Sequence, residues 1–150
     1  MNRVKGNITT TPQTAKGAVR VEAEAAQLAH VRQFVEEIAR EAHLDRERMF
    51  DLKVAVCEAC ANALEHACNQ SAFLEVCAYL DEERLTFVVT DRGVFRRARA
   101  SRGPVLRRGL GLPLMVALMD EVVFARTPEG GTQVSLSVAL PPAKITPENA

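Results

Sequence analysis

The stretch from Lys53 to Ala67 constrains the fold of this chain more than any other, because it combines an apolar face with regularly spaced polar side chains. Its small or apolar residues recur at helical spacing, which predicts a helix. They are Val54, Val56, Cys57, Cys60, Ala63, Leu64 and Ala67. Glu58, Asn62 and His66 follow one another at steps of four, and each step turns a helix by only about 40°. These three side chains therefore share one stripe. Burying them without partners would cost about 1–3 kcal/mol each, and a nucleotide with its metal ion would supply partners.

Composition and charge are those of an ordinary globular domain. The 150 residues are 47% hydrophobic and 25% charged, which is enough apolar material for one sizeable core. Because the net charge is zero and Trp is absent, we expect no direct partner among nucleic acids or acidic membranes. No apolar run approaches the roughly 18 residues of a membrane span, and the polar N-terminus lacks a signal-peptide core. We therefore expect a cytoplasmic protein.

The cysteines allow two interpretations. Cys57, Cys60, Cys68 and Cys77 are expected to be free thiols that serve as small core residues in a reducing compartment. The alternative is a zinc site, because Cys57-x-x-Cys60 has ligand spacing and His66 is near. Such sites usually lie in knuckles and loops, whereas Cys57 and Cys60 on one continuous helix do not converge easily with Cys68.

The remaining patterns predict strands and helices over residues 18–140, flanked by a flexible tail at 1–17 and a polar tail at 141–150. Strands are predicted at 18–22, 72–80, 84–90, 121–126 and 132–140. Helices are predicted at 24–43, from the N-cap Asp45 to about 69, and from a glycine turn at Gly109 to 120. Residues 94–108 are expected to form an arginine-rich loop. The order predicts an α+β two-layer sandwich, with a mixed, mostly antiparallel sheet and helices on one face.

Four motifs resemble, in order, those of one known family. Glu58-Ala-Cys-Ala-Asn62-Ala-Leu-Glu-His66-Ala67 is similar to the N-box, E-x-x-x-N-A-x-x-H-A, of the anti-sigma-factor serine/threonine kinases. These kinases belong to the Bergerat (GHKL) ATPase superfamily. Asp91-Arg-Gly93 resembles the D-x-G box, Gly109-Leu-Gly111-Leu112 resembles the G-L-G-L box of the lid, and Gly131-Thr132 resembles the final G-T box. The resemblance covers roughly residues 18–140.

The resemblance implies a site for ATP and Mg²⁺. Asn62 would be the metal ligand, since Mg²⁺ prefers oxygen ligands, and Glu58 would accept the proton of the attacking hydroxyl. The carboxylate of Asp91 would accept the adenine amino hydrogen, and Gly93 would leave room for the purine. Two roles have open alternatives. Thr132 would support Asp91 or lie on the surface, and His66 would contact the nucleotide or be a half-buried, satisfied histidine.

The glycine motif is expected to hold the phosphates. Gly109, Gly111 and Leu112 would let backbone amides approach phosphate oxygens at the start of a helix, where the helix dipole favours negative charge. At least one arginine of the loop would also contact phosphate; the alternative is a solvated basic loop. The candidates are Arg96, Arg97, Arg99, Arg102, Arg107 and Arg108.

The function that the resemblance implies is that of a protein kinase and anti-sigma factor. Such a protein phosphorylates a Ser or Thr of a small STAS-domain antagonist, sequesters a sigma factor and forms a homodimer. One alternative is a regulatory module without kinase activity, because the stretch after Gly93 departs from the family pattern D-x-G-x-G-F. A second alternative, the catalytic domain of a histidine kinase, is disfavoured because residues 1–17 cannot form a helical hairpin that carries a phospho-accepting histidine.

Overall fold

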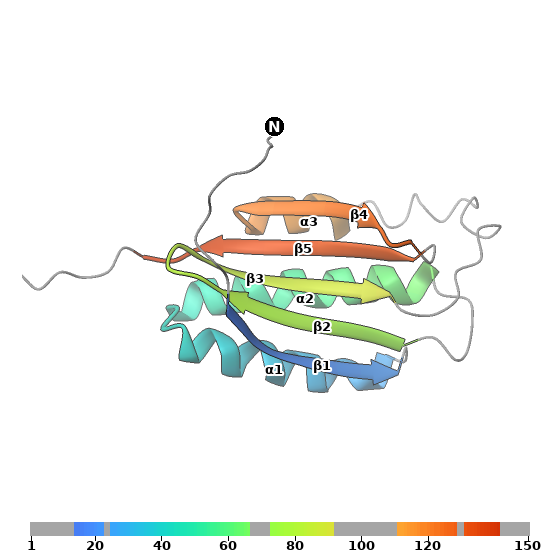
Figure 1. Cartoon of the computed structure of the whole chain (residues 1–150), viewed down its shortest axis with the longest axis horizontal. Helices are drawn as coiled ribbons and strands as arrows, with labels where there is room; N and C mark the ends of the chain where they lie inside the picture. The colour runs from blue at the N-terminus through green and yellow to red at the C-terminus, as the bar shows by residue number, and fades with distance from the viewer. Residues whose placement is uncertain (1–13, 23–24, 67–72, 92–110, 129–130, 142–150) are drawn as a thin grey trace, which may run out of the picture.

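A computed structural model of the chain describes residues 14–22, 25–66, 73–91, 111–128 and 131–141. Within them the chain forms five strands and three α-helices (Figure 1). In order these are β1 (Thr14–Glu22), a 3-10 turn (Ala25–Gln27), α1 (Leu28–Glu41), α2 (Arg46–His66), β2 (Phe73–Leu80), β3 (Arg84–Asp91), α3 (Gly111–Leu118), β4 (Glu121–Arg126) and β5 (Thr132–Ala139).

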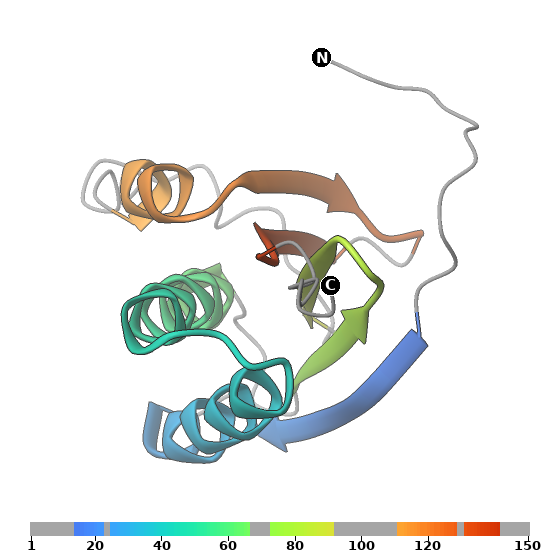
Figure 2. The same cartoon turned by 90° about the vertical axis from the view of Figure 1, so that its left-hand side faces the viewer.

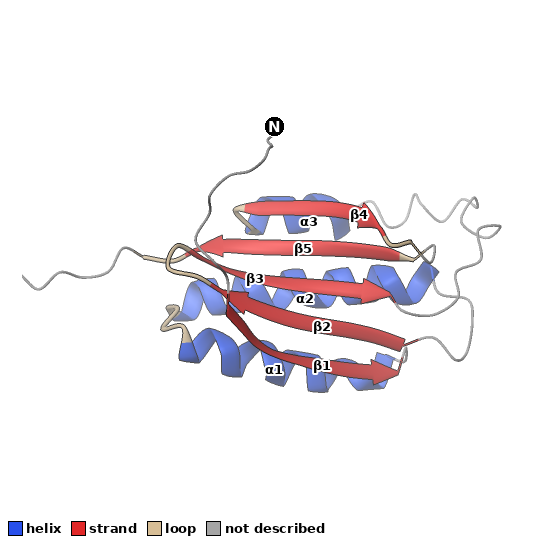
Figure 3. Cartoon of the chain, viewed as in Figure 1, coloured by secondary structure: helices blue, strands red, loops and turns tan. Residues whose placement is uncertain are grey.

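The strands form one sheet in the order β1-β2-β3-β5-β4, and the three helices cover one of its faces (Figures 2 and 3). This arrangement confirms the predicted two-layer α+β sandwich. One detail of the prediction was wrong, because every pair of neighbouring strands in the described sheet is antiparallel rather than mixed. β2 and β3, and likewise β4 and β5, are consecutive strands joined by short turns, and a short turn can join only antiparallel neighbours.

Most element bounds agree with the sequence patterns to within two residues, and β4 agrees at both ends. Two starts differ by four residues. The helix predicted from residue 24 begins at Leu28, after the 3-10 turn, and β1 begins at Thr14, inside the stretch predicted to be a tail. A bulge between Ala15 and Gly17 interrupts its pairing with β2, and nearly all of its side chains are exposed. Because an exposed edge strand needs no alternation of apolar residues, the first half of β1 has no sequence pattern that predicts a strand.

The core lies between the sheet and the helices. The inward side chains of β3 are Leu85, Phe87 and Val89, and all three are buried. Phe34 of α1 packs edge-on against Phe87, with the two ring centroids 6.0 Å apart. The opposite edge of Phe34 approaches Gly17 of β1, where an added Cβ would lie 3.4 Å from the ring. The bulge therefore makes room for an aromatic side chain that ties α1 to both β1 and β3.

The two ends of the α1–α2 connection are set by local hydrogen bonds. Asp45 caps α2 as predicted, because its Oδ1 accepts a hydrogen bond of 2.8 Å from the backbone N of Arg48. The preceding helix ends in a Schellman motif, in which the backbone N of His43 donates to Arg40 O and the N of Leu44 donates to Ala39 O, each at 3.0 Å. His43 consequently has a left-handed backbone, with φ of 61°.

Replacing His43 with glycine is expected to stabilise the protein. An L-residue in the left-handed region costs about 1–2 kcal/mol, and glycine removes most of that cost while adding some entropy to the unfolded chain. We expect His43→Gly to raise the free energy of unfolding by about 1 kcal/mol, which corresponds to a Tm increase of roughly 2–4 °C. His43→Ala is the matched control, because it retains a Cβ and should not gain stability. An equal gain in both variants, measured by thermal denaturation, would argue against backbone strain at His43.

Candidate functional site

Four element ends meet at one end of the molecule. They are the C-terminal ends of α2 and β3 and the N-terminal ends of α3 and β5 (Figure 1). The central helix α2 contacts β3, β5 and α3 directly. The motifs that were predicted to form one site lie on these same ends: Glu58 and Asn62 on the second half of α2, Asp91 at the end of β3, Gly111 at the start of α3, and Thr132 at the start of β5.

Asp91 and Gly131 form the tightest contact at this end. Asp91 is only 3% exposed, and it is the last residue of β3. An added Cβ on Gly131 would lie 2.5 Å from the backbone O of Asp91, a distance that no Cβ can adopt. The neighbouring residues pair in register, with Thr90 opposite Gln133. Only glycine can therefore occupy position 131 while β5 runs this close to Asp91.

The turn before β5 holds Gly131 in place. The backbone N of Thr127 donates to Gly131 O at 3.0 Å, and the N of Gly131 donates to Thr127 Oγ1 at 2.9 Å. These bonds fix Gly131 against the carboxylate residue, which takes part in polar contacts of its own. The Oδ2 atom of Asp91 is buried and accepts no hydrogen bond from any described residue. A buried carboxylate oxygen beside a constricted backbone suits recognition of a donor group such as an amine.

Glu58 and Asn62 lie on the partly exposed side of α2. The other side of this helix supplies fully buried residues to the core, among them Ala55, Val56 and Cys60. Glu58 and Asn62 are half-buried, and Asn62 already takes part in a polar contact. Their spacing of four residues puts them one above the other on the helix. Together they present a carboxylate and an amide on a rigid support, and both groups offer the oxygen atoms that Mg²⁺ requires.

Part of the predicted site lies outside the described residues. Gly93, Gly109 and the candidate arginines fall there, and so do the side chains of His66 and Leu112. The described residues bring Asp91 and Thr132 to the ends of neighbouring strands. Thr132 is half-buried and pairs with Arg126 of β4 on its other side.

Sequence reasoning missed Thr127, whose hydroxyl anchors Gly131. A threonine that opens a Thr-Pro-x-Gly-Gly turn is a local signal, since its hydroxyl can bond to nearby backbone groups. It also missed the contacts of Arg48 with Asp120, which lies 72 residues further along the chain. No local pattern links those two residues.

Of the four cysteines, Cys60 is a buried core residue, Cys57 and Cys77 are half-buried, and Cys68 lies outside the described residues. Cys57, Cys60 and Cys77 are not in disulfides, and the described part of the chain contains no group of three or more residues that could hold a metal ion. Burial raises the pKa of the Cys60 thiol to about 12. Burial also raises the pKa of Cys57, although the nearby Arg32 opposes the shift.

Within the described residues, no helix has the length and hydropathy to cross a membrane.

Comparison with known proteins gives a consistent family assignment. The family model for the histidine kinase-like ATPase domain matches residues 21–138. The chain is 34% identical to an anti-sigma F factor of Pasteuria penetrans over 101 residues, which are 60% of this chain and 67% of the relative. It is 41% identical to the serine-protein kinase RsbW of Bacillus velezensis over 86 residues, 48% of this chain and 54% of the relative. This chain spans about half the length of the RsbW relatives that it matches first.

Solved structures share the fold. The RsbU and RsbW domains of a Mycobacterium tuberculosis protein match with a TM-score of 0.64 at 23% identity, over 91% of this chain and 35% of that chain. The SiaB–SiaC complex of Pseudomonas aeruginosa matches with a TM-score of 0.61 at 8% identity, over 83% of this chain and 89% of that chain. At these identities the likeness concerns the fold alone.

A side chain at position 131 should disturb the site through the backbone of β3. We expect Gly131→Ala to lower the free energy of unfolding by about 1–3 kcal/mol, the usual cost of overpacking, because β3 and β5 must separate to admit the methyl group. Thermal denaturation measures the loss. Ser135→Ala, a half-buried position on the same strand, should change the Tm by much less. A Gly131→Ala variant as stable as the wild type would mean that the two strands are not held this closely.

Proposed function

Since this chain belongs to the family of histidine kinase-like ATPase domains, we propose that it is an ATP-dependent serine/threonine kinase that also acts as an anti-sigma factor. ATP with Mg²⁺ is the proposed cofactor pair. The single observation that carries the proposal is the meeting of Asp91, Gly131 and the second half of α2 at one end of the fold. The names of the relatives, anti-sigma F factor and serine-protein kinase, support the same class of activity.

The end of β3 is the proposed adenine-binding part of the site. A buried carboxylate that recognises an amino group gives specificity, because any ligand without that donor would leave the oxygen unsatisfied. Asp91 meets this requirement at 3% exposure. Gly131 holds the neighbouring backbone against Asp91, and Thr132, the next residue, is proposed to support the carboxylate. Gly93 is proposed to border the purine.

The second half of α2 is the proposed catalytic part. Bound Mg·ATP supplies the phosphoryl group and the metal charge that offsets its negative charge. The Asn62 amide oxygen is proposed to ligate the metal, and His66, one turn further along the helix, to contact the nucleotide. Glu58, one turn earlier, is proposed to accept the proton of the substrate hydroxyl as general base. Gly109, Gly111 and Leu112 are proposed to hold phosphate oxygens through backbone amides.

The proposed substrate is a Ser or Thr of a STAS-domain antagonist, and the proposed second partner is a sigma factor, both in the cytoplasm. We also propose that the active form is a homodimer. The alternative function is a module that regulates its partners through contact alone, which is favoured by the departure of Val94-Phe95 from the family pattern after Gly93. Nucleotide binding and phosphate transfer, measured separately, distinguish the two.

Mg·ATP is expected to raise the thermal stability of the protein. A ligand at 100 times its Kd stabilises the folded state by about 2.7 kcal/mol. Asp91→Asn should remove most of this shift, because its amide turns a donor toward the adenine amino group. Glu82→Gln, at an exposed position of the β2–β3 turn, is the matched control and should keep the full shift. If the wild type shows no shift with Mg·ATP, the contact-only alternative is favoured.

Glu58→Gln is expected to slow phosphate transfer without weakening the binding of Mg·ATP. The amide cannot take up a proton, so transfer of radiolabelled phosphate to the STAS-domain protein recovered by pull-down should fall by about 10²–10⁴-fold. The thermal shift with Mg·ATP should remain. Glu47→Gln, an exposed glutamate in the first turn of the same helix, should transfer phosphate at the wild-type rate. Undiminished transfer by Glu58→Gln would remove Glu58 from the role of base.

A further inference from the structure

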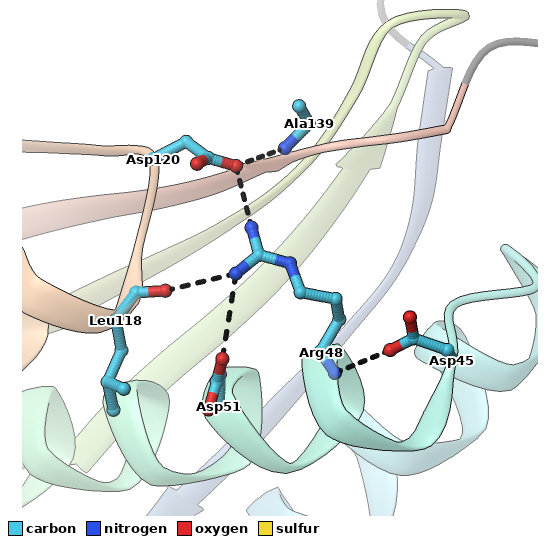
Figure 4. Close-up of polar contacts among 6 residues, drawn as sticks. All are labelled: Asp45, Arg48, Asp51, Leu118, Asp120 and Ala139. Atoms are coloured by element: carbon cyan, nitrogen blue, oxygen red, sulfur yellow. Dashed lines mark hydrogen bonds and ion pairs between the residues drawn. The ribbon is translucent and has the colours of Figure 1, made fainter.

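At the end of the molecule opposite the candidate site, Arg48 joins α2 to the turn between α3 and β4 (Figure 4). Its Nη2 lies 2.7 Å from Asp120 Oδ2, its Nη1 donates to the backbone O of Leu118 at 3.4 Å, and the same nitrogen lies 3.6 Å from Asp51 Oδ2. We call Arg48, Asp120 and the Leu118 carbonyl the clamp. Its guanidinium contacts both the last residue of α3 and the acidic residue that follows.

Asp120 also connects the clamp to the sheet through hydrogen bonds to β5. Its Oδ2 accepts a second hydrogen bond of 2.6 Å from the backbone N of Ala139, and its own backbone N donates to Ser137 O at 2.9 Å. Ala139 and Ser137 both belong to β5, the strand that begins beside Asp91. The C-terminal end of α3 is therefore attached to α2 through Arg48 and to β5 through Asp120. An arginine that makes several bonds in a fixed plane positions its partners more strictly than a single surface ion pair does.

The helix held by the clamp is short, and among the described residues it packs mainly against α2. α3 is eight residues long, and within and just after it Met115 and Met119 are buried, whereas Leu114 and Val116 are 38% and 60% exposed. A helix of two turns is stable mainly through its tertiary contacts, so the contacts at its C-terminal end help to set its position. The end opposite the clamp begins at Gly111. In Figure 1 this N-terminal end of α3 faces the same end of the molecule as the C-terminal ends of α2 and β3.

We propose that Arg48 is a positioning residue for the nucleotide: by clamping the C-terminal end of α3 to α2, it sets where Gly111 lies relative to Asn62. The inference rests on the proposed function. Arg48 and Asn62 belong to the same helix, about 21 Å apart along its axis at 1.5 Å per residue, so the clamp and the metal-binding position are parts of one rigid element. The adenine-binding position is on β3, which the clamp does not touch. Loss of the clamp should therefore weaken contacts to the phosphates and leave recognition of adenine unchanged.

The experiment compares two ligands on the full chain. Equilibrium dialysis with radiolabelled compounds gives the Kd of Mg·ATP and the Kd of adenosine, which has no phosphate. We expect Arg48→Met to raise the Kd of Mg·ATP about tenfold, a factor typical of coupling between separate sites, and to leave the Kd of adenosine within about twofold. Arg48→Lys should be intermediate, because an ammonium can pair with Asp120 without also donating to Leu118 in the same plane.

A matched control tests whether the effect on the Kd of Mg·ATP is specific to the clamp or follows from the loss of any ion pair at this end of the molecule. Arg84 bonds to Glu121 at 2.6 Å and joins β3 to β4 without touching α3. Arg84→Met should leave both Kd values unchanged. Asp120→Asn, which is nearly isosteric, should repeat the effect of Arg48→Met, and the double variant should be no worse than the more affected single variant. Asp120→Asn also decides the question if Arg48→Met does not fold, as judged by circular dichroism.

The outcomes separate the inference from the function on which it rests. A wild type that binds neither ligand overturns the proposed function and the inference with it. A wild type that binds Mg·ATP, together with clamp variants whose Kd values for ATP are unchanged, overturns the inference alone. Equal weakening of ATP and adenosine also overturns it, because that result indicates a general loss of structure. Selective weakening of ATP supports it.

Discussion

The fold depends on the burial of one side of α2. This helix contacts both other helices and the two strands β3 and β5, and its inner residues, such as Ala55, Val56 and Cys60, have no exposed surface. Small residues at these positions let the helix lie close to the sheet. The close approach has a functional consequence, because it leaves the polar side of the same helix, with Glu58 and Asn62, at a fixed position relative to Asp91. Packing and site geometry are therefore set by the same contact.

Much of the fold could be predicted from the sequence, because the elements that cover the core have strong periodicity. The short apolar segment at 121–126 was predicted as a strand, and β4 has the same bounds; Asp45 was predicted to cap α2, and it does. The first half of β1 could not be predicted, since an exposed edge strand with a bulge at Gly17 has no apolar face to reveal it. The pairing of β1 with β2 and of β3 with β5 needed the structure, because local patterns do not fix the order of strands in a sheet.

The candidate site was predictable to the extent that it is built from contiguous motifs. Asn62 and Glu58 are four residues apart, so helical geometry alone places them together, whereas Asp91 needed the family resemblance to gain a role. The closeness of Gly131 to the Asp91 carbonyl follows from strand pairing and could not be read from either segment. Arg48 and Asp120 are the extreme case, because 72 residues, including β2, β3 and α3, separate them in the chain.

The buried thiol of Cys60 has a chemical consequence for the helix that carries the site. Oxidants and electrophiles react with thiolates, and a pKa of about 12 keeps this thiol protonated at neutral pH. The Cys60 thiol is thus protected from redox conditions that modify accessible cysteines. Folding raises the pKa of this thiol from its ordinary value of 9.0 to about 12. Its contribution to stability is therefore complete below pH 9.0 and is lost as the pH rises through about 12. Alkali, rather than oxidation, is the condition to which the Cys60 thiol is chemically exposed.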